Sequence, residues 1–161
     1  MQTVLFLVEA ALVAGLGLWM AVAVADNWRH PRLNEEAVAM VVRFDLMARD
    51  HPEDFAHIAH RRIDDPTLIR RMFHAIRLAE TLAAVVLFGS ALLLVLAAGG
   101  AVPGTIATGA AIVSAAFFTL IWGGFIIGGN YFAYWYCHQW AQSNHFMLLY
   151  WGFFVLLVLM I

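Results

Sequence analysis

The chain has 161 residues, of which 63% are hydrophobic and only 12% are charged, and its formal net charge is −2. A water-soluble protein of this size needs more polar surface than this composition supplies, so lipid is the expected solvent for most of the chain. Lysine is absent and the net charge is slightly negative, which argues against nucleic acid as a partner.

The first apolar run covers residues 3–25. With a rise of about 1.5 Å per residue, a helix of this length crosses a hydrocarbon core of about 30 Å. Glu9 interrupts the run. Because a carboxylate inside a bilayer is costly, we expect Glu9 to face other helices or another subunit, or to be protonated.

Residues 26–77 form the one hydrophilic segment and contain all nine arginines, so this segment is expected to lie outside the hydrocarbon. Apolar residues at helical spacing predict a helix over 35–49 that lies in the membrane interface. A second short helix is predicted to open at Pro52. Asp65, followed by Pro66, is the predicted N-cap of a third helix.

The remaining apolar runs predict three more membrane spans, at residues 79–98, 105–129 and 145–161. The first of these is expected to be the upper part of a single helix that starts at Pro66. Ser143 and Asn144 are expected to cap the last span. The tyrosines and tryptophans within 130–140 indicate an aromatic belt at the headgroup level.

These elements together predict an all-α fold in a single membrane domain, residues 1–161. The expected architecture is an integral membrane four-helix bundle with a helical extramembrane segment between spans one and two. Four spans place both termini on one side. Packing of the third span is expected at Gly124 and Gly128, whose spacing forms a small-residue groove for a helix of the same chain or of a neighbouring subunit.

Seven histidines raise the question of haem or metal binding. A bis-histidine haem would need His74 to face His138 or His145 at the membrane interface. Asp54, His57 and His60 share a predicted helical face and could supply ligands to zinc or copper. The alternative for these three is a solvated polar helix face, since no CxxC or HExxH motif accompanies them.

A polar collar is predicted where the hydrophilic segment meets the membrane, from His74, Glu80, Asn130 and Tyr131. Such a collar could bind a quinone or a lipid headgroup. The structural alternative is an ion pair between Arg77 and Glu80, with amide and phenol donors satisfying the rest of the carboxyl group. No GxSxG motif or glycine-rich phosphate loop is present, so no catalytic reaction is expected.

The pattern Ile-Gly-Gly-x-Tyr-Phe-x-x-Trp from Ile127 to Trp135, with Asn27-Trp28 after span one and Glu80 at the start of span two, resembles a bacterial family of predicted small integral membrane proteins of unknown function. The resemblance implies a four-helix fold in the bacterial inner membrane and no catalytic residues. It also implies that residues 26–77 are periplasmic. The positive-inside rule, applied to the arginines of this segment, favours the cytoplasm instead.

Three functional hypotheses follow. The first is a non-catalytic accessory or scaffold subunit of a larger membrane complex, in contact with lipids and other subunits and without a cofactor. The alternative is a protein that binds haem, quinone or lipid near His74, Glu80 and Tyr131. The third is a module that associates with further copies of itself through Gly124 and Gly128.

Overall fold

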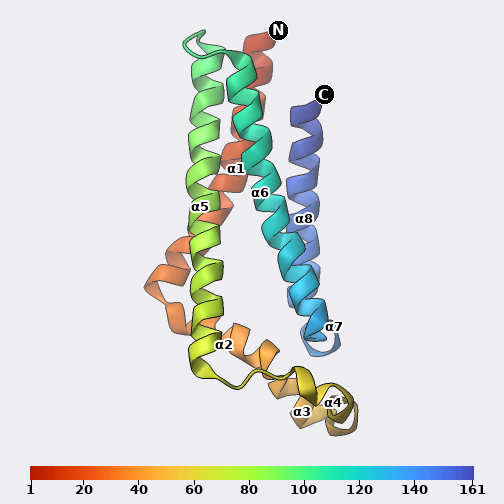
Figure 1. The fold of residues 1–161 in the computed structure, drawn as a ribbon. Helices are drawn as coiled ribbons and strands as arrows, with labels where there is room; N and C mark the ends of the chain where they lie inside the picture. The colour runs from red at the N-terminus through yellow and green to blue at the C-terminus, as the bar shows by residue number, and fades with distance from the viewer.

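The computed structural model describes residues 1–161 and is helical throughout (Figure 1). Four helices are long and apolar enough to cross a membrane: α1 (Gln2–Arg29), α5 (Pro66–Ala98), α6 (Gly104–Tyr131) and α8 (Gln139–Met160). The predicted all-α fold with four membrane helices is therefore confirmed. Both termini lie at one end of the bundle, and the hydrophilic segment covers the other end (Figure 1).

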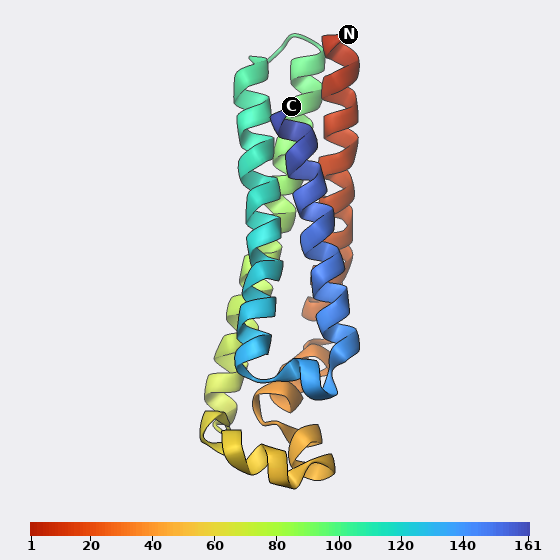
Figure 2. The same ribbon diagram turned by 90° about the vertical axis from the view of Figure 1, so that its right-hand side faces the viewer.

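The four long helices pack in the order α1, α5, α6, α8, and α1 contacts α8 much less than it contacts α5. The α5–α6 contact is close because fully buried alanines of α6 face the core, among them Ala107, Ala111 and Ala115. Within this core the hydroxyls of Ser90 and Ser114 lie 2.7 Å apart. Toward the hydrophilic end α6 separates from α5 and stays beside α8 (Figures 1 and 2).

Helix α5 spans the membrane and continues beyond it, as the sequence predicts. Its N-cap is Asp65, whose carboxylate accepts a hydrogen bond of 2.8 Å from the backbone N–H of Thr67. The helix then runs without a break to Ala98. Gly100 turns the chain with a φ of 76°, a conformation that favours glycine, and α6 begins at Gly104.

The hydrophilic segment forms a cap, which we define as residues 31–61. Its helices are α2 (Pro31–Val42), α3 (Asp45–Asp50), α4 (Pro52–Ile58) and the 3₁₀ helix η1 (Ala59–Arg61). The single helix predicted over 35–49 is wrong, because Phe44 adopts a left-handed conformation with a φ of 57° and separates α2 from α3. Packing explains the break: the ring of Phe44 is buried, with its centroid 5.9 Å from those of both Phe55 and Phe132.

The connection between α6 and α8 contains the short helix α7 (Tyr134–Cys137), which follows a left-handed residue, Ala133. Helix α8 already begins at Gln139, so the predicted cap at Ser143 and Asn144 is wrong. Both residues lie inside the helix, where the backbone N–H groups already have partners one turn earlier.

Candidate functional site

A buried carboxyl group marks the membrane boundary at the capped end. Glu80 of α5 is only 5% exposed, and its Oε2 accepts a hydrogen bond of 2.7 Å from Nδ2 of Asn27, near the end of α1. Asn34 of α2 in turn donates to Oδ1 of Asn27. Three helices are therefore joined by one chain of side-chain hydrogen bonds, which satisfies polar groups that would otherwise face lipid.

Arg77 does not take part in this network, so the predicted ion pair between Arg77 and Glu80 is wrong. Its guanidinium lies 3.8 Å from the ring centroid of Trp28, and its Nη2 lies 2.8 Å from Nδ1 of His74. Helical side chains tilt toward the helix N-terminus, which for α5 is the capped end. The long arginine therefore reaches the interface, while Glu80 turns into the bundle.

The polar collar predicted from His74, Glu80, Asn130 and Tyr131 is not assembled by hydrogen bonds. His74 is bonded to Arg77, and both Asn130 and Tyr131 are exposed. The backbone carbonyl of Tyr131 accepts a hydrogen bond from Arg61 of the cap. Tyr131 therefore anchors the cap instead of supplying a phenol to Glu80.

A second cluster, which the sequence did not reveal, lies between α6 and α8. We call it the aromatic stack and define it as Trp122, Phe125, Tyr134 and His145. The imidazole of His145 lies nearly parallel to the rings of Trp122 and Tyr134, with centroid distances of 5.5 Å and 5.9 Å. Phe125 packs against both Trp122 and His145. His145 is thus part of an aromatic core, and it is not arranged as a partner of His74.

Three polar atoms of the aromatic stack are buried and have no hydrogen-bond partner: Trp122 Nε1, Tyr134 Oη and His145 Nδ1. The sequence offered one signal for this cluster, since Phe118, Trp122 and Phe125 follow one another at helical spacing and mark an aromatic inner face of α6. Placing Tyr134 and His145 beside that face requires the turn at α7, which no local pattern predicts.

The predicted metal ligands are not brought together. Asp54 Oδ2 accepts a hydrogen bond of 2.6 Å from the hydroxyl of Tyr136, and this bond raises the pKa of Tyr136. His57 lies in α4 and His60 in η1, so a continuous helical face is interrupted between them. No group of three or more His, Cys, Asp or Glu side chains is arranged to hold a metal ion.

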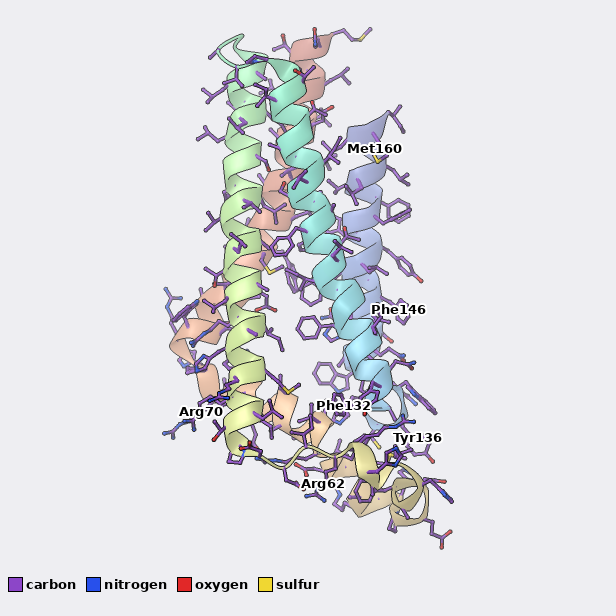
Figure 3. The ribbon with its side chains drawn as sticks, in the orientation of Figure 1. Arg62, Arg70, Phe132, Tyr136, Phe146 and Met160 are labelled. Atoms are coloured by element: carbon purple, nitrogen blue, oxygen red, sulfur yellow. The ribbon has the colours of Figure 1, made fainter.

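The connection beyond α6 contains two further titratable groups. Burial raises the pKa of the Cys137 thiol and lowers that of the His138 imidazole. A thiol with a raised pKa is a poor nucleophile at neutral pH, and Cys137 packs beside Phe44 and Met47 of the cap. Figure 3 shows Phe132 and Tyr136 at the end of the bundle that the cap covers.

Gly124 and Gly128 lie on an outer face of α6. Both are exposed, and a Cβ atom added to either would meet no atom within 4 Å. The neighbouring Gly129 differs, because an added Cβ would lie 2.7 Å from the ring of Tyr134. The close packing expected at Gly124 and Gly128 is therefore not provided by another helix of this chain.

Comparison with known protein families identifies the family of this chain. Residues 5–161 match the model of the family described as predicted small integral membrane protein (DUF2165). The chain belongs to this family. No curated protein and no solved structure matches it. Family membership agrees with the four membrane helices, and this chain is an integral, multi-pass membrane protein.

Proposed function

We propose that this protein is a non-catalytic accessory subunit that packs against an apolar helix of a larger membrane complex. The observation that carries the proposal is the open face of α6 at Gly124 and Gly128. Each glycine inside a helix costs about 0.5–1 kcal/mol relative to alanine. Within this chain neither glycine gains a close contact in return, whereas a second helix could approach the backbone closely there.

The experiment replaces both glycines with leucine, Gly124→Leu with Gly128→Leu, which would fill the open face. Gly89→Leu is the matched control, since Gly89 is also an exposed glycine on a membrane helix with no atom within 4 Å of an added Cβ. Each variant is purified from membranes in mild detergent, and the size of the assembly and the copurifying proteins are determined.

We expect the wild-type protein and Gly89→Leu to retain the same partner subunit, and the double variant to lose it. A wild-type protein that is monomeric and brings no partner would contradict the accessory role. Recovery of further copies of this chain, and of no other protein, would also contradict the accessory role. It would identify self-association as the function of the α6 face at Gly124 and Gly128.

We further propose that the protein lies in a bacterial inner membrane with residues 26–77 on the periplasmic side, as the sequence resemblance implies. Replacing Cys137 with alanine leaves a cysteine-free chain. A single cysteine is then introduced by Asp64→Cys or by Ala101→Cys. Both positions are exposed; residue 64 lies before α5 and residue 101 lies after it. In intact cells, an impermeant maleimide should label the cysteine at position 64 and leave that at position 101 unlabelled. The reverse pattern would place the cap in the cytoplasm.

The ligand-binding alternative near His74, Glu80 and Tyr131 gains no support from the geometry. Glu80 is bonded to Asn27, His74 is bonded to Arg77, and Tyr131 is 55% exposed on the outside of the bundle. A ligand there would have to break the hydrogen bonds that Glu80 and His74 already make.

A further inference from the structure

The side chain of Arg77 is a cation held in a fixed position at the membrane boundary. Its guanidinium lies 3.8 Å from the ring centroid of Trp28, and its Nη2 lies 2.8 Å from Nδ1 of His74. The ring of Trp28 is fixed in turn, because its Nε1 donates a hydrogen bond of 3.1 Å to Oγ1 of Thr81. The hydroxyl of Thr81 donates to the backbone carbonyl of Arg77. The guanidinium is therefore positioned before a ligand arrives, which lowers the entropy cost of binding.

No carboxylate of the chain neutralises Arg77. Three other arginines form the ion pairs of this chain, and Arg77 takes part in none of them. Glu80, one turn further along α5, accepts its hydrogen bond from Asn27. Asp26 lies on another side of α1 from Trp28, since two helical residues correspond to a rotation of about 200°. The positive charge of Arg77 is thus available to an anion from outside the chain.

The free N–H groups of Arg77 fit a phosphate group. A guanidinium has five N–H donors, of which one is directed at His74 and another, on Nε, is buried. Nη1 makes no hydrogen bond and is not buried. Nη1 and the second N–H of Nη2 form a fork that can donate to two phosphate oxygens. Binding there leaves the hydrogen bonds of His74 and Glu80 intact.

The surroundings of Arg77 favour the phosphate of a lipid over a free phosphate ion. Arginine and tryptophan side chains at the end of a membrane helix lie at the level of the lipid headgroups. Val85 and Phe88 follow Arg77 by eight and eleven residues, which places them within about 80° of it around α5. Both are exposed apolar side chains on the membrane-spanning part of α5, where an acyl chain would cover them.

We propose that Arg77, on its platform of Trp28, binds the phosphate of an anionic phospholipid whose acyl chain lies along α5. A headgroup with net negative charge is favoured, because the ammonium of a zwitterionic headgroup would be repelled by the unpaired guanidinium. This site lies on the outside of α1 and α5 and is separate from the α6 face at Gly124 and Gly128.

The test titrates phosphatidylglycerol or phosphatidylcholine with the same acyl chains into the purified, delipidated full-length chain in mild detergent. Native mass spectrometry counts the bound lipids and gives the affinity of each. We expect the wild-type protein to bind the first phosphatidylglycerol at least about fivefold more tightly than phosphatidylcholine, as one arginine near a charged headgroup predicts. Inorganic phosphate at the same concentration should not displace the lipid, because it has no acyl chain to cover Val85 and Phe88.

Two variants and a matched control locate the site. Arg77→Gln should weaken phosphatidylglycerol binding about tenfold, the loss expected for hydrogen bonds to a charged group. Arg71→Gln removes the same charge from an exposed residue of α5 that forms no ion pair and lies about 120° around the helix from Arg77. This control should change the affinity by less than about twofold. Trp28→Leu keeps every arginine and should weaken binding about threefold, because the cation–π contact is lost. Its outcome stands if Arg77→Gln fails to fold, and circular dichroism establishes that each variant is folded.

Three results would overturn the proposal. Equal affinities for phosphatidylglycerol and phosphatidylcholine in the wild-type protein would mean that Arg77 does not select a charged headgroup. Equal losses in Arg77→Gln and Arg71→Gln would mean that lipid is attracted only by the overall charge. Displacement of the lipid by inorganic phosphate would assign the site to a free anion. None of these results bears on the accessory role, which is tested by copurification at Gly124 and Gly128.

Discussion

The hydrogen bond between Asn27 and Glu80 makes a quantitative prediction about stability. Asn27→Leu removes the one donor that the structure gives the Glu80 carboxyl group, and it also leaves Asn34 without its acceptor. A buried polar group left unsatisfied costs about 1–3 kcal/mol. Glu80→Leu should cost less, because the buried Asn27 side chain keeps its hydrogen bond with Asn34.

The double variant, Asn27→Leu with Glu80→Leu, should be less destabilised than the sum of the two single variants. Replacing both partners by apolar groups of similar size leaves no unpaired carboxyl group in the bundle. Interhelical hydrogen bonds in membranes couple by about 0.6 kcal/mol on average and up to about 1.7 kcal/mol. Given the burial of Glu80, we expect a coupling free energy of about 1 kcal/mol.

The assay is reversible unfolding with sodium dodecyl sulfate in mixed phospholipid and detergent micelles, followed by circular dichroism. Asn130→Leu is the control, because Asn130 is an exposed amide at the same end of the bundle and its loss should change stability by less than about 0.5 kcal/mol. Strict additivity of the Asn27 and Glu80 variants would refute the reasoning, since it would show that the two side chains do not support each other.

Three further predictions concern packing and titration. Gly152→Ala should destabilise the protein by about 1–3 kcal/mol in the same unfolding assay, because the new methyl group would meet the side chains of Thr119 and Phe118. Gly109→Ala is the control: no atom lies within 4 Å of a Cβ added there, so this change should be neutral or stabilising. Phe44→Gly should cost about 2 kcal/mol, because the loss of a buried ring outweighs relief of the left-handed backbone; an unchanged midpoint would contradict this. Tyr136 should ionise above its usual pKa of about 10, and Asp54→Ala should lower that pKa in an absorbance titration at alkaline pH. The hydrogen bond to Asp54 raises the pKa of Tyr136 in the folded protein, so this bond stabilises the fold fully below a pH of about 10. The stabilisation is lost as the pH rises through the raised pKa of Tyr136.

The sequence predicted the parts of the fold that depend on hydropathy and local chemistry. Long apolar runs identify the four membrane helices, because each run is sufficient by itself to cross the hydrocarbon. Asp65 and Pro66 likewise fix the start of α5 through a cap that needs no distant partner. The amide of Asn27 donates a hydrogen bond to Glu80, which agrees with the expectation that amide donors would satisfy this carboxyl group.

The parts that failed depend on tertiary contacts. The break at Phe44 exists because its ring packs on Phe55 and Phe132, which come from other segments. The aromatic stack was missed for a related reason: the spacing of Phe118, Trp122 and Phe125 marks an aromatic face of α6, but only the turn at α7 brings Tyr134 and His145 beside it. His145 therefore read as a candidate ligand at the interface, although it lies between Trp122 and Tyr134.

The cap links the pair α6 and α8 to the rest of the bundle at one end. Because α1 and α8 contact each other only weakly, the pair α6 and α8 is held to α1 mainly through α5 and through the cap. Phe44 packs on Phe132, and Tyr136 donates to Asp54, so the cap is joined directly to the connection between α6 and α8. Both left-handed residues of the chain, Phe44 and Ala133, are buried in this junction. Each costs about 1–2 kcal/mol of backbone strain, which persists only where packing outweighs it. The strained backbone at Phe44 and Ala133 is therefore outweighed by the packing that joins the cap to the connection between α6 and α8.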